Sequence, residues 1–427
     1  MSAPAAGTRR SSAAGIPGSW RAPQHRDGMA LVLSSALSSG IGLLFWVLAA
    51  RLFDPVTVGL NTTVVSTMTL LGTAAQLNLG NAMLRFVPVA GHGTRALVAG
   101  CYAVGVGAAA AVGVVFALGA SWWAPDLLAA FGQSALLAFF VVSTPIGTLF
   151  VMQDYVLPAI KRAVVVPVEN LVFSVLKIVL LAAAAGLGIA GGIAVSWVVA
   201  TALVVVGVSA YLLRALPPAG PPAPQEPPAV TARDVARFVR ADYAGTVFWQ
   251  AALFGLPLVV IARLGPEGAA VYNMVWQIGY ALYLVANGMG QSLVAHAAAD
   301  PSRLDAARDG MVSKALTLIV PTVIVVSPCA YLVLSVFGTT YADVGAPLLV
   351  LLLVSAVPNT VTAAAVWAAR VRRDARVLFG LPAGISTAVI AGSWVLMPAM
   401  GVTGAGVAWL AAQTVAAAGV LLLRRPA

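Results

Sequence analysis

Three ionisable side chains interrupt long apolar runs of this 427-residue sequence: Asp154, Glu169 and Lys177. If those runs cross a bilayer, each charge is costly unless it is paired, reaches the interface or faces water, so such residues indicate a functional site. Lys177 would then offer a cation to an anionic ligand within the membrane. In the alternative, the two acids pair with Lys161 and Arg162 near the interface, and Lys177 extends outward to it.

Two arginines occupy matching positions, Arg51 in Ala-Arg-Leu-Phe-Asp-Pro and Arg263 in Ala-Arg-Leu-Gly-Pro. At the outer mouth of a cleft, both would attract an anionic headgroup. In the alternative, each pairs with its neighbour, Asp54 or Glu267, and anchors a helix end. The sequence leaves both interpretations open.

Amide side chains concentrate in three of the apolar runs, where they suit a hydrated cavity that binds a hydroxyl-rich substrate. Hydrogen bonding between helices explains such residues equally well. The amides are Asn61, Gln76, Asn78, Asn81, Gln250, Asn273, Gln277, Asn287 and Gln291.

The sequence lacks the residue patterns of catalysis and metal binding. No nucleophile stands beside a base, no cluster has metal-ligand spacing, and no Walker-type phosphate loop is present. Cys101 and Cys329 both lie in apolar runs and are interpreted as small packing residues. We therefore expect no enzymatic activity, no cofactor and no metal.

Composition indicates an integral membrane protein. Apolar residues make up 60% of the chain, charged residues only 9%, and the mean hydropathy is +0.95, whereas soluble domains carry about 25% charged residues. Residues 1–27 are rich in Ala, Ser, Gly and Arg and are expected to form a disordered cytoplasmic tail. The apolar run that follows is too long for an ordinary signal core and is predicted to remain as the first span.

Positive charge alternates along the chain and predicts the orientation of the protein. Nearly every Lys and Arg falls in every second polar gap, and the gaps between hold only Arg51 and Arg263. Cytoplasmic loops carry such an excess, so both termini are predicted to be cytoplasmic. The net charge of +10 therefore sits in inner loops, where it contacts anionic lipids rather than nucleic acid.

Twelve apolar runs, each long enough to span a bilayer, divide into two sets of six. We predict an N-terminal lobe over 28–214, a proline-rich cytoplasmic linker over 215–235 and a C-terminal lobe over 236–427. A short helix on the inner face is expected over 232–242. The predicted spans are 29–50, 58–84, 96–118, 132–157, 163–184, 188–213, 239–262, 269–297, 311–337, 345–369, 377–398 and 402–423.

The two sets resemble each other at a nearly constant offset of 209 to 213 positions. Asn78-Leu79-Gly80-Asn81 recurs as Asn287-Gly288-Met289-Gly290-Gln291, and Gly188 to Gly191 with Trp197 recurs as Gly401 to Gly404 with Trp409. Six spans per set give both lobes the same orientation, an arrangement of transporters whose substrate path runs between repeats. The predicted fold is thus an all-α polytopic bundle of two parallel six-helix lobes.

The motifs resemble those of a known family. The run from Gly40 to Pro55, the segment Asn81-Ala82-Met83-Leu84-Arg85-Phe86-Val87-Pro88 and the segment from Gly401 to Trp409 are similar to Wzx-type oligosaccharide flippases. These belong to the multidrug/oligosaccharidyl-lipid/polysaccharide exporter superfamily. The resemblance covers about residues 28–424.

The resemblance implies a V-shaped pair of lobes that moves a polyprenyl-(di)phosphate-linked oligosaccharide from the inner to the outer leaflet of a bacterial cytoplasmic membrane. It implies membrane lipids and this substrate as ligands, with glycosyltransferases or a polymerase of the same pathway as partners. Basic residues would hold the diphosphate, and amides would hold the sugars. The resulting candidates are Arg51, Arg85, Lys177, Arg263, Asn61, Asn78, Asn81, Gln250, Asn273, Gln277, Asn287 and Gln291.

Other functions compete with this one. An ion-coupled multidrug exporter of the same superfamily would carry a carboxylate deep in the first or seventh span, but the first has none and Asp242 lies at the membrane edge. A membrane polymerase or ligase would carry a sizeable charged outer loop, and the outer gaps here are short. A major-facilitator transporter would show its Gly-x-x-x-Asp-Arg pattern between Arg85 and Arg95, which this chain lacks.

Overall fold

The computed structural model describes residues 41–162, 164–216, 231–297, 304–372 and 374–423. Regular secondary structure in these ranges is entirely helical, which confirms the predicted all-α class. The predicted tail over 1–27 and most of the predicted linker lie outside the described residues. The predicted first span is described from residue 41 on, as the helix Ile41–Leu52.

Nine helices of the described chain are long and apolar enough to cross a membrane. One of them holds two predicted spans, because α11 continues through a bend at Gly265, where φ is 70°. The helices are α2 (Pro55–Ala75), α3 (Leu79–Phe86), α4 (Thr94–Leu118), α5 (Ala120–Trp123), α6 (Pro125–Phe131), α7 (Gln133–Ala159), α8 (Val165–Gly186), α9 (Gly192–Ala215), α10 (Ala232–Gln250), α11 (Leu256–Ala297), α12 (Leu304–Val326), α13 (Ala330–Ser335), α14 (Thr339–Arg372), α15 (Ala375–Met400) and α16 (Thr403–Leu422).

The predicted second span is broken near its inner end. Leu77 and Asn78 have positive φ angles of 51° and 59°, and they separate α2 from α3. Asparagine tolerates the left-handed region better than most residues, so Asn78 is a natural place for the break. The equivalent Asn287 stays inside α11, so the two halves differ here despite their similar sequences.

The helix expected over 232–242 begins at Ala232 as predicted, but it does not end at residue 242, so the expectation of a short separate helix is wrong. Helix α10 begins at a capping box, in which Thr231 and Asp234 bond each other's backbone amides. The helix then continues through a π-helical turn, Ala251–Gly255, into α11. The apolar residues after 243 leave no polar stretch at which the helix would end.

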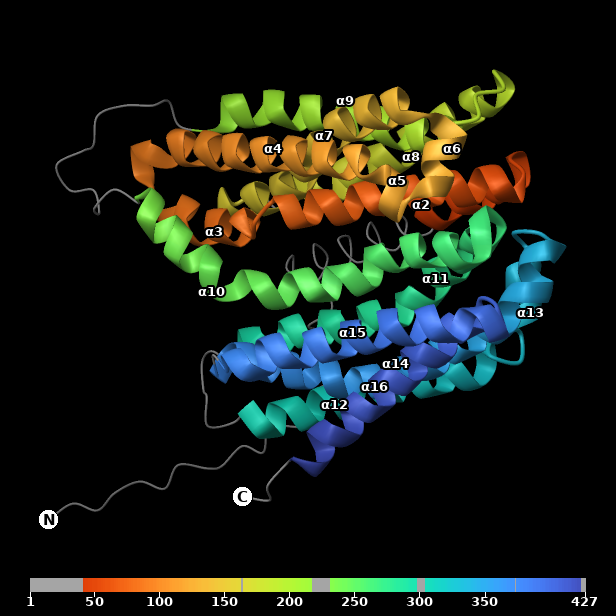
Figure 1. Cartoon of the computed structure of the whole chain (residues 1–427). Helices are drawn as coiled ribbons and strands as arrows, with labels where there is room; N and C mark the ends of the chain where they lie inside the picture. Colours follow the sequence, from red (N-terminus) through yellow and green to blue (C-terminus); the bar gives the residue numbers. More distant parts are fainter. Residues whose placement is uncertain (1–40, 163, 217–230, 298–303, 373, 424–427) are drawn as a thin grey trace, which may run out of the picture.

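The described helices form two groups, which Figure 1 shows as an upper and a lower layer. The first half comprises Ile41–Leu52 and α2 to α9, and the second half comprises α10 to α16. The same packing partners recur in both: α4 on α7 and α12 on α14, α8 on α9 and α15 on α16, α7 on α9 and α14 on α16. This repetition supports the internal repeat.

Matching close contacts strengthen that conclusion. A Cβ on Gly80 would collide with the ring of Tyr155, and a Cβ on Gly290 would collide with the ring of Trp367. The glycines lie 210 positions apart and the aromatic residues 212 positions apart. In both halves, a glycine thus lets an aromatic ring of a later long helix, α7 or α14, pack against the backbone.

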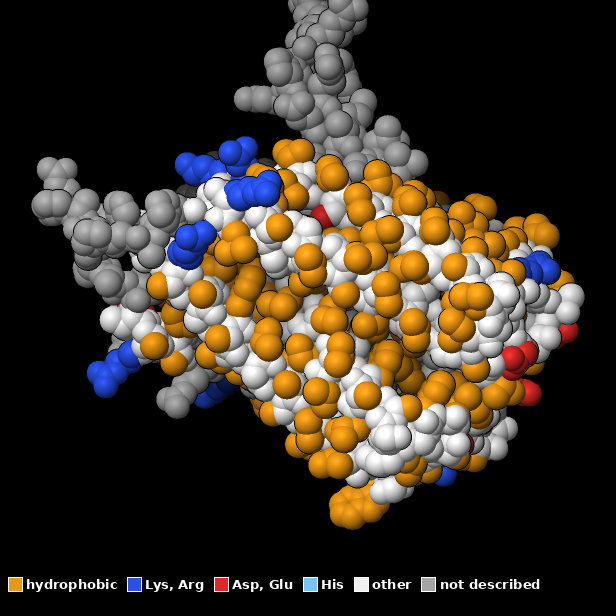
Figure 2. Space-filling model, turned by 90° about the horizontal axis from the view of Figure 1, so that it is seen from above, with side chains coloured by type: hydrophobic (Ala, Val, Ile, Leu, Met, Phe, Trp, Pro, Cys, Tyr) orange, Lys and Arg blue, Asp and Glu red, His pale blue; other side chains and the backbone are white. Residues whose placement is uncertain are grey.

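The surface fits a bilayer. In Figure 2, apolar side chains cover the middle of the visible face, and basic side chains gather mainly at the end that holds α3 and α10 in Figure 1. Large apolar side chains such as Val115, Val206 and Val395 are more than half exposed, which a protein immersed in lipid requires. The chain is therefore a polytopic membrane protein.

Candidate functional site

Lys177 lies inside the first half, enclosed by aromatic rings. It is on α8, only 4% of its surface is exposed, and its Nζ lies 4.2 Å from the centre of the Trp197 ring. The rings of Phe173 and Phe45 follow at 4.7 Å and 5.0 Å. Three neighbouring segments, the helix Ile41–Leu52, α8 and α9, thus supply one ring each to an aromatic cage.

The cage is built by contacts among its own rings. Trp197 meets Phe45 at 5.5 Å and Phe173 at 5.3 Å, both nearly edge to face, which is a favourable arrangement. Gly42 opposite leaves room, because a Cβ there would lie 4.0 Å from Nζ of Lys177. The site is therefore preorganised around the ammonium, and each ring face attracts a cation.

The ammonium has no acidic partner in the described part of the chain. The ion pairs among these residues join Asp305 to Arg308 and Arg372, and Arg308 to Asp309. The rings face Nζ of Lys177 and supply no negative charge of their own that would neutralise a cation there. The second half has Val389, fully buried, 212 positions after Lys177, so this packing position does not require a charge.

The two matching arginines make different contacts. The guanidinium of Arg51 donates hydrogen bonds of 2.9 Å to the carbonyl oxygens of Ser335 and Val336, at the end of α13 in the other half. Arg263 stays within its own half, where it donates to the Trp394 carbonyl at 3.0 and 3.1 Å and lies over the Trp394 ring. Arg51 thus binds the partly negative carbonyl end of α13, and Arg263 binds a backbone carbonyl of α15. Neither forms the predicted ion pair with Asp54 or Glu267 within the described residues.

Asp54 instead begins α2. Its carboxylate accepts a hydrogen bond of 3.0 Å from the Thr57 amide. The hydrogen bonds from Thr57 hold the pKa of Asp54 below its ordinary value, because they stabilise the ionised form.

Arg85 lies apart from the other basic candidates. It is exposed near the end of α3 and lies over the Phe86 ring at 5.4 Å. Helix α2, of 21 residues, separates it from Arg51 by about 30 Å. In this conformation, Arg51, Arg85, Lys177 and Arg263 do not form one cluster.

The matching amides Asn61 and Asn273 also differ in their partners. Asn61 donates to Thr57 and Ala190 carbonyls at 2.9 Å each and accepts from the Ala194 amide at 3.1 Å. It therefore caps the start of α9 within the first half. Asn273 donates to the Thr62 hydroxyl in the other half at 3.2 Å and to the Ala269 carbonyl at 2.8 Å.

The other predicted amides are dispersed. Asn81 donates to the Asn78 side chain at 2.6 Å beside the helix break, and Asn287 donates to the Tyr283 carbonyl of its own helix. Gln277 is exposed and Gln250 is half-buried at the end of α10. The side chain of Gln291 lies outside the described residues.

The halves meet along a seam between α2 and α11. A Cβ on Gly59 would collide with the Pro266 backbone, so the two helices touch at that point. Ser66 donates to Asn273 at 3.4 Å, and the Tyr243 hydroxyl of α10 donates to the Ala74 carbonyl at 2.7 Å near the other end. The seam is thus closed here and carries hydrogen bonds along its length.

Sequence reasoning missed the hydroxyl residues of this seam. Thr62, Thr63, Ser66 and Thr67 are buried or half-buried on α2. Their spacing of three and four residues places them on one helix face. That spacing in Asn-Thr-Thr-Val-Val-Ser-Thr was the available signal.

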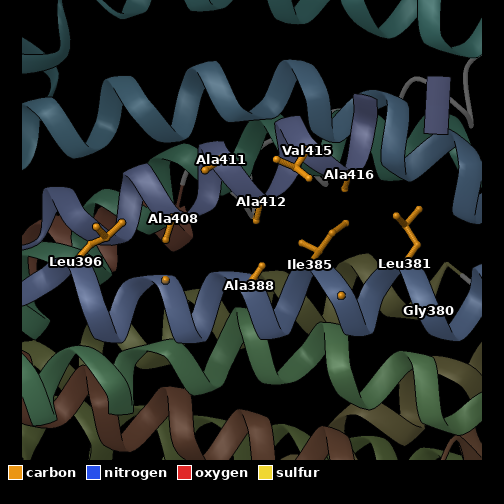
Figure 3. Close-up of a pocket in the computed structure, with 12 residues that line it drawn as sticks. Gly380, Leu381, Ile385, Ala388, Leu396, Ala408, Ala411, Ala412, Val415 and Ala416 are labelled. Atoms are coloured by element: carbon orange, nitrogen blue, oxygen red, sulfur yellow. The ribbon is translucent and has the colours of Figure 1, made fainter. Parts of the chain in front are cut away.

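A cavity of about 490 Å³ lies elsewhere, between α15 and α16. In Figure 3, side chains from these two helices face each other across it, and those labelled are apolar. Small residues recur every four positions on α15 as Gly380, Gly384, Ala388 and Gly392. Their side chains project little toward α16, which leaves the space of the cavity. An apolar lining cannot solvate a sugar or a phosphate, so the polar candidate site is the cage and the seam.

Several solved structures share this fold. Lipid II flippase MurJ, in an inward closed conformation, superposes with a TM-score of 0.67 at 11% identity, over 92% of this chain and 87% of that chain. An inward-facing multidrug resistance MATE transporter of the MOP superfamily gives 0.62 at 16% identity, over 92% of this chain and 93% of its own. The Vibrio cholerae MATE transporter VcmN also gives 0.62, at 13% identity, over 93% and 97%.

The sequence itself carries no comparable match, since no family model and no curated protein matches it. At these identities the structural likeness establishes the fold and leaves the substrate open. The expected architecture is confirmed to that extent. This chain has the same fold as the MurJ and MATE transporter structures.

Proposed function

We propose that the protein moves a polyprenyl-(di)phosphate-linked oligosaccharide from the inner to the outer leaflet of a bacterial cytoplasmic membrane. The moving units are the predicted lobes, 28–214 and 236–427, joined by the linker and crossing the membrane twelve times. The likeness to a structure described as a lipid II flippase supports this substrate class. The basic end of the molecule faces the cytoplasm.

The observation that carries the proposal is the caged ammonium of Lys177. A cation held by rings alone, with no described carboxylate near enough to pair with it, keeps its charge available to an anion. In a site shielded from water, its attraction for a diphosphate is much stronger than at a surface. The equivalent valine, Val389, leaves this role to the first half alone.

The seam supplies the moving part of the mechanism. When the halves separate, Thr62, Ser66 and Asn273 lose their mutual bonds and turn hydroxyl and amide groups toward the opened path. Those groups can hydrogen-bond a sugar, while the lipid tail remains in the bilayer. Arg51 closes the outer end again by binding the end of α13. Ligand binding shifts this equilibrium only through its different affinity for the two states.

An ion-coupled multidrug or small-molecule exporter is the second candidate. The likeness to MATE transporters favours it. An ion-dependent efflux assay with the purified protein in vesicles separates the two proposals, because a flippase of lipid-linked sugars does not export soluble cations.

The test is depletion of the protein in its native host, followed by measurement of lipid-linked oligosaccharide on each leaflet. We expect the intermediate to accumulate on the inner leaflet, and the wild-type chain to restore outward delivery. Normal delivery in depleted cells that hold no second transporter would refute the proposal.

A further inference from the structure

The apolar cavity between α15 and α16 takes no part in the transport proposed above. Its lining residues Gly384, Ala388 and Val415 are exposed, whereas Ile385 and Ala412 are buried. The cavity is therefore a groove with a buried floor that opens to the outside of the bundle. In a polytopic membrane protein, an apolar surface on the outside of the bundle faces lipid.

The groove is a wedge whose walls touch at one end. A Cβ on Gly404 would lie only 2.7 Å from the carbonyl carbon of Leu396, and a Cβ on Gly392 would lie 3.1 Å from that of Ala408. A Cβ on Gly384 would meet nothing within 4 Å. Figure 3 shows the two helices diverging in the same direction. The wedge thus opens toward the start of α15.

The packing of the fold does not require small residues along this groove. Helices α8 and α9 are the counterparts of α15 and α16 at an offset of 212 positions, which relates Trp197 to Trp409. In the first half the equivalent row consists of large side chains, with Val168, Val172, Leu176 and Leu180 in place of Gly380, Gly384, Ala388 and Gly392. The small row, and the space that it leaves, therefore call for an explanation other than helix packing.

A basic residue continues the row at the open end of the wedge. Arg376 lies four residues before Gly380 and so on the same face of α15, about 6 Å further along the axis. It is exposed and forms no ion pair among the described residues. The neighbouring Asp374 carboxylate accepts hydrogen bonds from the backbone amides of Arg376 and Val377. The equivalent of Arg376 in the first half is Val164.

An apolar wedge with a cation at its mouth matches an amphiphile that has an anionic head and a hydrocarbon chain. A guanidinium binds phosphate strongly, and basic pockets between membrane helices bind anionic lipid headgroups. The groove runs from Gly380 to Leu396, about 24 Å along the helix, whereas one leaflet is about 15 Å thick. An extended acyl chain therefore finds enough length.

A second copy of the protein fits this groove less well. A helix is about 10 Å across and cannot enter a wedge between two helices that touch at Gly392 and Ala408. A flexible acyl chain can enter it and supply the dispersion contacts that an unfilled groove forfeits. Because lipid tails are as apolar as the groove, such packing and the headgroup contact decide the binding.

We propose that the groove between α15 and α16 holds one anionic phospholipid, with an acyl chain in the wedge and its phosphate at Arg376. The chain occupies the space that valine and leucine side chains occupy in the first half. This lipid stays with the second half and is distinct from the transported one. The proposal does not depend on the proposed transport function.

The experiment is native mass spectrometry of the full-length protein, released from detergent and titrated with phosphatidylglycerol or with phosphatidylcholine of the same acyl chains. One phosphatidylglycerol should bind the wild type more tightly than any phosphatidylcholine. Arg376→Gln should weaken that first binding step roughly fivefold, which is the contribution of one basic side chain beside an anionic lipid.

A second variant fills the groove. Gly384→Val combined with Ala388→Leu installs the side chains of Val172 and Leu176, and the open space around Gly384 accepts the first of them. This variant should bind phosphatidylglycerol no more tightly than phosphatidylcholine. Its control is Gly207→Val, at an exposed glycine of α9 that also has open space around it, which should bind as the wild type does.

The control for charge is Arg162→Gln. Arg162 is exposed in the loop before α8, and within the described chain it pairs with neither Asp154 nor Glu169, contrary to the alternative that the sequence offered. Its removal should leave the first binding step unchanged. The unfolding temperature of each variant checks that the protein is folded, and Arg376→Gln, at an exposed position, keeps the proposal testable if the filled variant unfolds.

Four results overturn the proposal. One is equal binding of the two phospholipids by the wild type, and another is unchanged phosphatidylglycerol binding in the folded filled variant. The third is displacement of phosphatidylglycerol by one equivalent of a polyprenyl phosphate, which assigns the groove to the transported lipid. The fourth is a wild-type dimer that the filled variant loses, which assigns it to a second copy. The depletion test of transport is read separately, so the flippase function can stand when this site fails.

Discussion

The side chain of Asn273 donates a hydrogen bond of 3.2 Å to the hydroxyl of Thr62, across the seam between the two halves. Its counterpart Asn61 forms its hydrogen bonds within the first half, where it caps the start of α9. One amide of an equivalent pair is therefore structural and the other joins the parts that must separate. The same division holds for Arg263 and Arg51.

Replacing Asn273 with alanine should loosen the seam. The change removes the hydrogen bond to Thr62 and the longer one from Ser66. One hydrogen bond contributes about 1 kcal/mol, so the closed state loses at least roughly fivefold in population relative to the open state. A cysteine at Ser66, in a background without Cys101 and Cys329, should then react faster with a water-soluble maleimide.

The control for that experiment is Asn287→Ala, which removes an amide that bonds only its own helix among the described residues. We expect the labelling rate to be unchanged by it. Equal acceleration by both variants would mean that Asn273 has no special part in closing the seam.

Removal of the Arg51 side chain should release the outer end of the halves. Its two hydrogen bonds to α13 involve a charged donor, but the group is exposed, so we expect a loss of about 1 kcal/mol. Spin labels at Leu52 and Thr340 in Arg51→Ala should report longer and broader distances than in the wild type. Arg263→Ala, which breaks bonds within one half, should leave the distribution unchanged. An equal change in both variants would contradict the conclusion that Arg51 holds the two halves together at this end.

Replacing Lys177 with methionine should stabilise the folded protein and slow its transport of lipid. A buried cation is costly, and an apolar residue of similar volume is often neutral or stabilising by about 1–4 kcal/mol. The unfolding temperature in detergent should therefore rise or stay constant. Val389→Lys, which puts a cation at the equivalent apolar position, should lower it by several degrees, and stabilisation by that variant would contradict the special role of the cage.

Asp54 should contribute stability that depends on pH. Because its folded pKa is lowered by Thr57, the contribution is complete above the unfolded value of about 3.9 and is lost as pH falls through the folded pKa. Asp54→Ala should lower the free energy of unfolding by about 1 kcal/mol near neutral pH, as the loss of a helix cap does. Thermal unfolding of both proteins should converge once the pH is below the folded pKa of Asp54, and a difference that grows in acid would reverse the sign of the argument.

Much of the fold follows from the sequence because lipid imposes simple rules. Apolar length located the nine helices of the described chain that can cross a membrane. The constant offset of the Trp197 and Trp409 motifs predicted a repeat that the packing of α8 on α9 and α15 on α16 supports. The break at Asn78 was not predicted, because periodicity and hydropathy continue smoothly through it. Only the left-handed φ angles reveal it.

The candidate site was less predictable. Lys177 stood out as a charge in an apolar run, but nothing in the sequence indicated that Phe45 and Trp197, 132 and 20 positions away, would enclose it. Arg51 was predicted to attract an anionic headgroup, but it binds carbonyls at the end of α13. That contact forms only because a segment 284 to 285 residues away in the sequence approaches it in the fold. Local pattern identifies which residues are unusual, whereas tertiary packing decides their partners.

The central claim is that a caged cation in the first half lets two moving lobes carry an anionic lipid headgroup across the membrane. Its most direct test is the rate at which a fluorescent polyprenyl-diphosphate sugar crosses vesicles that contain the purified protein, compared between wild type, Lys177→Arg, Lys177→Met and Val389→Met. Wild type and Val389→Met should transfer the lipid equally and Lys177→Arg partly, whereas Lys177→Met should be at least about tenfold slower, which corresponds to about 1.4 kcal/mol. Equal transfer by Lys177→Met and the wild type, in proteins of equal thermal stability, would contradict the claim.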